Sequence, residues 1–396
     1  MSWFSSVTNS VTSWWTGEPA PPAEPVVKEE EKDEMVAEEQ WVKDLGYDSV
    51  LKRGEPEDIH KEPKEIVLEP HARKFVVRSK DYLESRVKVA SGPSLLRYAA
   101  SDLIMAKGVD KLRHVCEFPS TLPQMHPERR FIVINWQLPG SPPFSYVVTY
   151  VFPSEEERAA ARAALSEEER AVEENAWNLL EKFVSEDADV DDAWRNSRFK
   201  LIPQIVEGPW YVRTVTPSNV PALIGNKLTT TYIRGANYFE LDVDITSSIA
   251  ANTIWSVVSG VTTSLVIDLA FVIQGNAPEE LPEQVFGTVR LSRISLSPDL
   301  VRVVVPTESQ VASPAPEAAS EAASETDAGT QTTPAVPETP VSTPVSDAAA
   351  PTTPKDGESA SAATTPEGES SAPAEESASA PATTVASPSS PADPVA

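Results

Sequence analysis

Eight short runs of β-branched and aromatic residues constrain the fold of this chain more than any other feature of its sequence. They lie between residues 74 and 296, and many are separated by Pro- and Gly-containing turns such as LPGSPP and VEGPW. Runs of this composition predict β-strands, and short turns between them favour antiparallel hairpins and meanders. The predicted strands cover residues 74–78, 131–138, 146–152, 211–215, 228–233, 238–245, 264–273 and 285–296.

Three further segments have the pattern of helices. Residues 94–106 are apolar along one side. Residues 154–186 contain the capping-box pattern SEEE twice, which predicts a helix that breaks before the second copy. Residues 247–259 are apolar enough to predict a helix that lies against a sheet.

Composition divides the chain into four parts. Residues 306–396 consist mainly of Pro, Ala, Ser, Thr and Glu and contain no aromatic residue. Such a segment buries too little apolar surface to offset its ordering entropy, so we predict a disordered tail. Residues 18–64 are acidic and contain Pro, which predicts a linker with one short helical stretch. Residues 65–305 then form the predicted domain, and residues 1–17 a predicted N-terminal helix.

Charge and residue usage argue against several classes of function. The 60 acidic and 33 basic residues give a net charge of −27, so we expect no nucleic-acid binding and no charge-driven docking on anionic membranes. The single cysteine, Cys116, excludes an intrachain disulfide and fits a reducing, cytoplasmic location. The four histidines lack metal-ligand spacing, and no P-loop, dinucleotide fingerprint or nucleophile elbow is found. We therefore expect no metal, cofactor or membrane span.

The first residues, MSWFSSVTNSVTSWWTG, carry three tryptophans and no charged side chain. On a helix, six apolar residues would lie within an arc of roughly 120°, with hydroxyl side chains over most of the remaining surface. These six are Trp3, Phe4, Val7, Val11, Trp14 and Trp15. Their aromatic, uncharged character is typical of helices that insert into lipid-packing defects. Docking into a groove of the same or another protein is the alternative interpretation.

Five blocks of sequence occur in the same order as in a known family. They are KFVVRSKDYLESRVKV, FIVINWQLPG, NSRFKLIPQIVEGPWYVR, PALIGNKLTTTYIRGANYFELDVDITSS and VIDLAFVIQGNAPEELPE. Through these blocks, residues 68–298 resemble the Enhanced Disease Resistance 2 C-terminal domain family. In plant members the domain follows a PH domain and a START lipid-transfer domain, so the resemblance implies association with lipid. Neither domain fits in the 64 residues before the predicted domain, which predicts a stand-alone member.

Together, the patterns and the resemblance predict an α+β fold with a predominantly antiparallel sheet and packed helices. One expected form is a START-like helix grip that encloses an apolar cavity. A β-sandwich with peripheral helices is the alternative.

One strand carries candidate acidic ligands. The run YFELDVDI places Glu240, Asp242 and Asp244 on one face of a strand. Carboxylates with this spacing are able to bind a divalent cation or to supply an acid/base pair. The simpler interpretation, which we favour, is a solvated face on a half-buried sheet.

Basic and amide side chains nearby are further candidates. Arg213, Lys227 and Arg234 are suited to contact a lipid headgroup, although pairing with the neighbouring carboxylates is the more ordinary arrangement. Asn135 and Gln137 come near the end of a predicted strand, where they either cap the strand or line a cavity.

The leading hypothesis is a non-enzymatic, lipid-associated peripheral protein, with its N-terminal helix on an intracellular membrane or lipid droplet and a lipid as ligand. One alternative is an adaptor whose N-terminal helix docks in a partner's groove, with further protein partners bound by the tail. The other alternative is an enzyme that uses the acidic strand 238–245. A cavity lined by apolar side chains would favour lipid binding, whereas a solid core would favour the adaptor.

Overall fold

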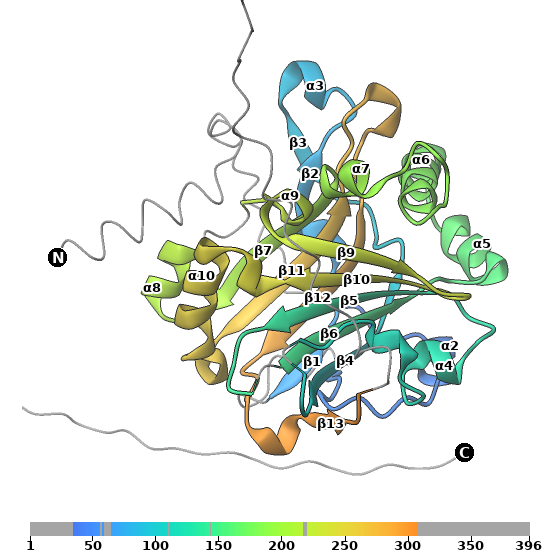
Figure 1. Ribbon diagram of the computed structural model, residues 1–396. Coiled ribbons are helices and arrows are strands. Elements are labelled where there is room, and N and C mark those ends of the chain that lie inside the picture. The colour runs from blue at the N-terminus through green and yellow to red at the C-terminus, as the bar shows by residue number, and fades with distance from the viewer. Residues whose placement is uncertain are drawn as a thin grey trace, which may run out of the picture. The chain divides into compact units, whose positions relative to one another are not determined.

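The computed structural model describes residues 35–306 except 56–57, 59–64, 110, 143 and 217–219. Two open sheets dominate this part of the chain, and helices lie at their edges and ends (Figure 1). Most strand pairs are antiparallel, so the predicted α+β class is confirmed.

The larger sheet contains six strands. In spatial order they are β13 (Arg302–Val304), β4 (Arg97–Ala106), β6 (Phe144–Val151), β5 (Phe131–Leu138), β10 (Tyr238–Asp244) and β9 (Thr229–Arg234). Strand β10 runs parallel to β5, and β13 runs parallel to β4, whereas the other neighbours are antiparallel.

The second sheet contains five strands. In spatial order they are β1 (Ile66–Leu68), β12 (Val285–Ser292), β11 (Val266–Ile273), β7 (Phe199–Glu207) and β8 (Ala222–Leu223). A separate hairpin is formed by β2 (Val76–Arg78) and β3 (Lys88–Ala90).

Helices are short apart from α6 and α10. They are α2 (Gln40–Lys43), α3 (Tyr82–Ser85), α4 (Leu122–Met125), α5 (Glu155–Ala163), α6 (Glu167–Phe183), α7 (Asp192–Asn196), α8 (Trp210–Val215), α9 (Ile224–Lys227) and α10 (Ile249–Ser259). Short 3₁₀ turns include η2 (Ala72–Lys74), η3 (Val115–Glu117), η4 (Ile245–Ser247), η5 (Thr262–Ser264), η6 (Pro278–Glu280) and η7 (Pro298–Leu300). The predicted break falls between α5 and α6, where Ser166 and Glu169 form a complete capping box.

The two sheets face each other across one aromatic core. Phe199 stacks on Phe271 with ring centroids 6.3 Å apart, and Tyr150 of the larger sheet meets Phe271 at 5.9 Å. Gly287 lets the sheets come this close, because a Cβ at this position would lie 2.6 Å from the Tyr150 ring. This contact fixes the spacing of the sheets at their centre.

Other segments cover the outer faces of the sheets. On the larger sheet, Val115 and Leu122 pack over Val133 of β5 in a second apolar cluster. On the smaller sheet, Phe75 and other residues near η2 and β2 pack over Val272 of β11. The central strands are therefore buried on both faces.

Part of the segment predicted to be a linker packs on this domain. Val42 and Leu45, within and just after α2, join the cluster on the outer face of the larger sheet. Leu51 belongs to the core between the sheets, and the Arg53 guanidinium donates to the Tyr98 carbonyl at 2.8 Å. The packed part of the chain thus includes residues 35–55.

Two sequence predictions of secondary structure are wrong: one predicted helix is a strand, and one predicted strand is a helix. Residues 94–106 were predicted as a helix, but they contain β4, because pairing with β6 and burial on both faces override a one-sided apolar pattern. Residues 211–215 were predicted as a strand, but they belong to α8. Pro209 at its N-terminal end suits a helix start, and Val212 and Val215 are buried at a helical spacing.

Candidate functional site

An apolar cavity of about 210 Å³ lies between the two sheets. Leu103, Trp136 and Tyr146 line it from the larger sheet, and Leu269 and Leu291 from the smaller one. Helix α10 contributes Trp255 and Val258, and η5 contributes Thr262. None of the lining side chains within the described residues is charged, so the cavity suits a hydrocarbon ligand.

The exposure pattern along β11 shows that the cavity is accessible to water-sized molecules. Val266, Asp268 and Ala270 point to the outer face of the sheet and are buried under other segments. Ile267 and Leu269 point between the sheets, yet they keep part of their surface accessible. Interior side chains in close-packed proteins do not usually keep such surface, so the sheets are not fully packed together here.

Helix α10 covers one side of the cavity. It begins at Ser248, whose hydroxyl caps the Ala251 amide, and its residues include no charged side chain. Only Ala251 among its residues is fully buried, so the helix lies on the sheets without sinking between them. The Trp255 indole stands edge-on to Phe144, with ring centroids 6.0 Å apart, which holds the helix beside the start of β6.

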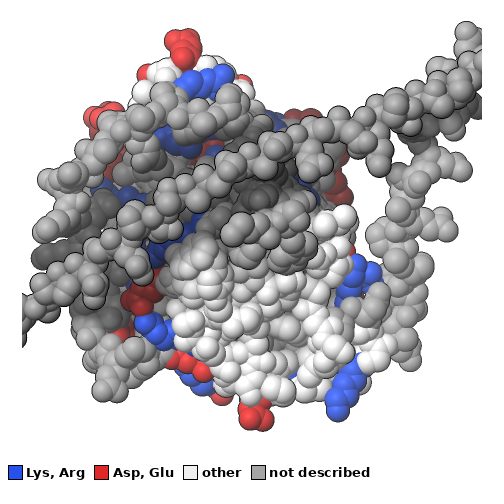
Figure 2. Space-filling view, turned by 90° about the vertical axis from the view of Figure 1, so that its left-hand side faces the viewer, with Lys and Arg blue, Asp and Glu red and all other residues white. Residues whose placement is uncertain are grey.

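An uncharged face surrounds this helix. Figure 2 views the molecule from the side of α8 and α10 and shows a broad area free of Lys, Arg, Asp and Glu. We call the surface made by Trp210, Tyr211, Ile249, Val257 and Val261 the α8–α10 face, because α8 and α10 pack together there. Trp210 is 72% exposed and Ile249 is 86% exposed, although both side chains are large and apolar.

The acidic strand does not form a solvated face. Glu240 is fully buried and Asp242 is 3% exposed, so the expected solvated face is a wrong prediction. The physical reason is the segment around η3, which crosses this side of β10. Its backbone amides donate to the carboxylates: Cys116 to Glu240 at 3.0 Å, and His114 to Asp242 at 2.9 Å.

The same carboxylates have further fixed partners. The Asn135 side-chain amide donates to Asp242 at 2.7 Å and to the Leu112 carbonyl at 2.8 Å, and Gln137 donates to that carbonyl at 2.9 Å. Asn135 and Gln137 therefore hold the covering segment and do not line the cavity, whereas Trp136 between them does. Asp244 pairs with Lys111 at the end of the strand.

Burial controls the protonation of this cluster. Desolvation, followed by the neighbouring Asp242 charge, raises the pKa of Glu240 well above its usual value of 4.5. Desolvation also raises the pKa of Asp242. Burial raises the pKa of the Cys116 thiol as well, which keeps this fully buried side chain uncharged. The raised pKa favours the uncharged form of Glu240, and its oxygens accept the amides of Val115 and Cys116, so we assign this cluster a structural role.

The predicted basic residues do not gather at one place. Arg213 donates to the carbonyls of Ile205 and Val206, and Arg234 lies 3.3 Å from Glu186. Lys227 is half-buried at the end of α9. In the part of the chain that the structure describes, none of these three cations pairs with the carboxylates of β10.

A surface groove of about 410 Å³ beside α6 is the second hollow of interest, and Arg234 lines it. Its other basic side chains are Arg130 and Lys182. Arg130 pairs with Glu181 at 2.9 Å, and Lys182 pairs with Asp189 at 2.7 Å. Because the charges of this groove are already neutralised by acidic partners, we do not assign it an anionic ligand.

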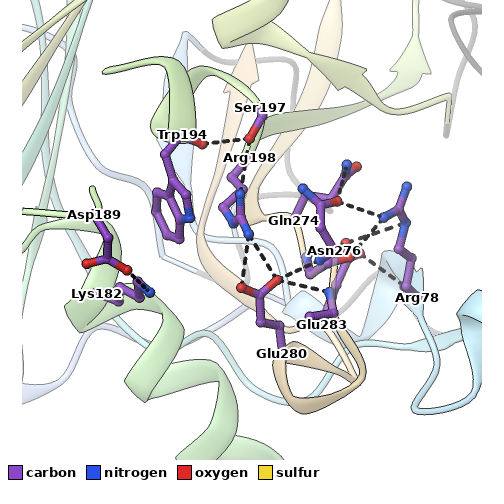
Figure 3. A network of polar contacts seen from close by, with 12 residues as sticks. Arg78, Lys182, Asp189, Trp194, Ser197, Arg198, Gln274, Asn276, Glu280 and Glu283 are labelled. Atoms are coloured by element: carbon purple, nitrogen blue, oxygen red, sulfur yellow. Dashed lines mark hydrogen bonds and ion pairs between the residues drawn. The ribbon is translucent and has the colours of Figure 1, made fainter. Parts of the chain in front are cut away.

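Loop 274–284 carries another polar network (Figure 3). Glu283 lies 2.6 Å from the Lys200 ammonium and accepts the amides of Gly275 and Arg78. Glu280 pairs with Arg198 at 3.0 Å and also accepts the Asn276 amide at 2.7 Å. Both carboxylates are held by fixed donors, so the network shapes the loop.

The six residues of the predicted N-terminal stripe, Trp3 to Trp15, lie outside the described residues. Between Met35 and Pro306, no described helix has the length and hydropathy that a bilayer span requires. Nor do three His, Cys, Asp or Glu side chains meet within the described chain in a way that could hold a metal ion.

Comparison with known proteins assigns the domain to a family. The family model described as "Protein ENHANCED DISEASE RESISTANCE 2, C-terminal" matches residues 68–295. The chain belongs to the Enhanced Disease Resistance 2 C-terminal family. Both polar networks and most of the cavity wall fall within the matched residues.

A curated relative from Arabidopsis thaliana, "Protein ENHANCED DISEASE RESISTANCE 2-like", is 37% identical over 229 residues. The match covers 57% of this chain and 28% of the relative, so the chain aligns with less than a third of that protein. No solved structure matches the chain.

The sequence predicts an apolar cavity in this domain, but it does not identify the residues that line the cavity. The lining comes from Leu51, from both sheets and from α10, and no sequence pattern joins segments so far apart. One signal was available: residues 245–267 contain no charged side chain, although charged residues make up 23% of the chain. A helix on the surface of a soluble domain usually carries charged residues on its outer side, whereas α10 has none and is only partly buried.

Proposed function

We propose that this chain is a non-enzymatic, lipid-associated peripheral protein whose domain holds one hydrocarbon chain of a lipid between its sheets. The cavity of about 210 Å³ is the observation that carries the proposal. Pockets for drug-sized ligands measure roughly 300–1,000 Å³, so this cavity suits part of one acyl chain. Even an apolar cavity of about 150 Å³ binds benzene in an engineered protein.

The energetics favour occupation of the cavity. An unfilled apolar space leaves its lining without dispersion contacts. A hydrocarbon chain would restore these contacts and would gain about 0.8 kcal/mol for each buried methylene. No lining side chain among the described residues requires a polar group from this part of the ligand.

We also propose that Trp3, Phe4, Val7, Val11, Trp14 and Trp15 attach the protein to a membrane or lipid droplet in the cytoplasm. Their sequence pattern supports this role. The net charge of −27 opposes attachment through charge, which leaves insertion of apolar side chains as the mode of binding.

The carboxylates of β10 give no support to the alternative of an enzyme. Glu240 and Asp242 already accept backbone and side-chain amides, and the η3 segment separates them from solvent. We assign them a structural role.

Native mass spectrometry of the full-length chain tests for a lipid that co-purifies. A cavity-filling variant makes the test specific. Leu269→Trp should weaken binding of cis-parinaric acid, a fluorescent fatty acid, by about tenfold or more, because the indole takes the space of the chain. Val303→Trp, at a position 53% exposed on β13, adds the same ring away from the cavity and should bind as the wild type does. Absence of fatty-acid binding by the wild type would overturn the proposal.

Flotation with neutral liposomes tests the N-terminal stripe. The combined change Trp3→Ala, Trp14→Ala and Trp15→Ala should reduce flotation, whereas Asn9→Ser should have little effect. Wild-type flotation should persist in about 0.5 M salt, because screening acts on charges and not on buried apolar area. Undiminished flotation of the triple variant would favour the protein-groove interpretation.

A further inference from the structure

We propose that the α8–α10 face docks on the surface of a bilayer with neutral headgroups, so that the helix-covered side of the cavity lies against the membrane. This inference rests on the proposed lipid binding and names where the ligand enters. Three properties of the described residues support it: exposed apolar side chains, absence of charge and contact with the cavity.

Two large apolar side chains project from this face. Trp210 begins α8 and Ile249 begins α10, and they are the most exposed tryptophan and isoleucine among the described residues. Behind them, Tyr211, Val257 and Val261 pack in one cluster that ties the two helices together. An indole and an aliphatic chain on a fixed support are suited to insertion at a membrane interface.

Charge distribution selects the type of membrane. Residues 245–267 contain no charged side chain, and the Arg213 guanidinium of α8 is turned back onto the carbonyls of β7. Charged side chains appear at the margin of the face in Figure 2. Because the whole chain is strongly acidic, anionic headgroups would repel it, whereas neutral headgroups meet an uncharged face.

The face and the cavity share a helix. Trp255 and Val258 line the cavity, whereas Ile249 of the same helix points to solvent. A single helix therefore separates the hydrocarbon site from whatever covers this face. Movement of α10 at a docked membrane would open a path for a lipid chain that does not pass through water.

A second copy of the chain is a less suitable occupant. Each copy carries a net charge of −27, which opposes close approach of two copies at low ionic strength. A dimer through this face would also cover the side of the cavity from which we expect lipid to enter.

Site-directed fluorescence on the full-length chain tests the docking. Cys116 is fully buried, so a cysteine introduced at an exposed position is labelled selectively by a polarity-sensitive maleimide dye. The dye on Ile249→Cys should increase its emission about twofold with vesicles of neutral phosphatidylcholine, because its surroundings become apolar. The dye on Met125→Cys, at a position 48% exposed on α4, should not respond.

A paired variant separates docking from ligand binding. Trp210→Ser with Ile249→Ser should slow transfer of cis-parinaric acid from vesicles to protein by about tenfold. Affinity for the free fatty acid in solution should remain at the wild-type value, because neither residue lines the cavity. If the wild type does not bind the free fatty acid in solution, the proposed function has failed, and this result is distinct from a failure of docking.

Three results would overturn the docking proposal. The first is no dye response at residue 249 while the protein floats with vesicles. The second is high emission of the dye at residue 249 in the absence of vesicles, if this emission falls when Trp3, Trp14 and Trp15 are changed to alanine. That result would identify the N-terminal segment as the occupant of the α8–α10 face. The third is a change from dimer to monomer in the Trp210→Ser, Ile249→Ser variant, which would identify a second copy as the occupant.

Discussion

The indole Nε1 of Trp255 donates a hydrogen bond of 3.0 Å to the backbone carbonyl of Pro139. Trp255 lies on α10 and Pro139 directly follows β5, so the bond ties the covering helix to the larger sheet. It is formed beside the cavity, which makes it a fixed point for the helix above an incompletely filled core.

We predict that Trp255→Phe loosens α10 without unfolding the domain. The substitution keeps an aromatic ring at the cavity and removes the donor, at a cost of about 0.5–1.5 kcal/mol in the free energy of unfolding. Amide hydrogen exchange in residues 249–259 should accelerate more than exchange in β5. Trp210→Phe, a control at an exposed ring, should leave amide exchange unchanged both in residues 249–259 and in β5. If the two tryptophan variants exchange at equal rates, the hydrogen bond from Trp255 to Pro139 does not hold the helix.

Asp268 is predicted to be the most sensitive acidic position of the smaller sheet. Its carboxylate is fully buried and accepts from Arg290 at 2.8 Å and from Lys74 at 2.9 Å. Asp268→Asn leaves these cations without their counter-charge and should lower the free energy of unfolding by about 3–5 kcal/mol. Urea denaturation measures the change. Glu207→Gln breaks the exposed pair with Arg293 and should leave the midpoint unchanged; similar losses in both variants would show that burial does not decide the effect.

Glu240 gives the domain a predicted pH dependence. Its pKa is raised in the folded state, so the folded protein binds a proton that the unfolded chain releases above its usual pKa of 4.5. The contribution of Glu240 to the free energy of unfolding is fully present below pH 4.5 and is lost as the pH rises through the pKa of the folded state. The loss amounts to about 1.4 kcal/mol for each unit by which the folded pKa exceeds the unfolded pKa.

Glu240→Gln removes this titration. It also leaves an amide of Val115 or Cys116 without an acceptor, so the variant should be less stable than the wild type at pH 5. The difference between the two proteins should narrow as the pH rises from 5 to 9, because unfolding of the wild type releases a proton from residue 240 in this range and unfolding of the variant does not. Urea denaturation at the two pH values gives the comparison, and a constant difference would show that Glu240 is ionised throughout.

Deletion of residues 307–396 is predicted to leave the domain intact. This stretch has no aromatic residue and consists mainly of Pro, Ala, Ser, Thr and Glu, so it offers little apolar surface for packing. Thermal unfolding followed by circular dichroism should give a Tm within about 2 °C of the full-length value, which corresponds to a small change in free energy. A larger decrease would mean that the deleted residues pack on the domain.

Local patterns predicted the elements that depend on local interactions. The capping boxes at Ser154 and Ser166 fix two helix starts through bonds within one turn, and the structure has both. Residues 94–106 were misassigned because their apolar residues fit one side of a helix as well as a strand, and only pairing with β6 decides between them.

The site depended on contacts that are distant in sequence. The alternation of YFELDVDI correctly separates Glu240 from Leu241, but it does not reveal that the segment around His114 covers the acidic side. Burial of the carboxylates follows from that covering segment, more than a hundred residues earlier in the chain. The cavity is a similar case, because a space between sheets has no sequence pattern of its own.

The composition of the cavity wall has a consequence for biosynthesis. Leu51 and Leu296 both line the cavity, so its wall includes residues from near the beginning and the end of the domain. During translation the nascent chain can form hairpins early, but the wall is incomplete until residue 296 has left the ribosome. The hydrocarbon ligand proposed above would therefore find no finished site on the growing chain, and its loading would follow synthesis of residues 51–296.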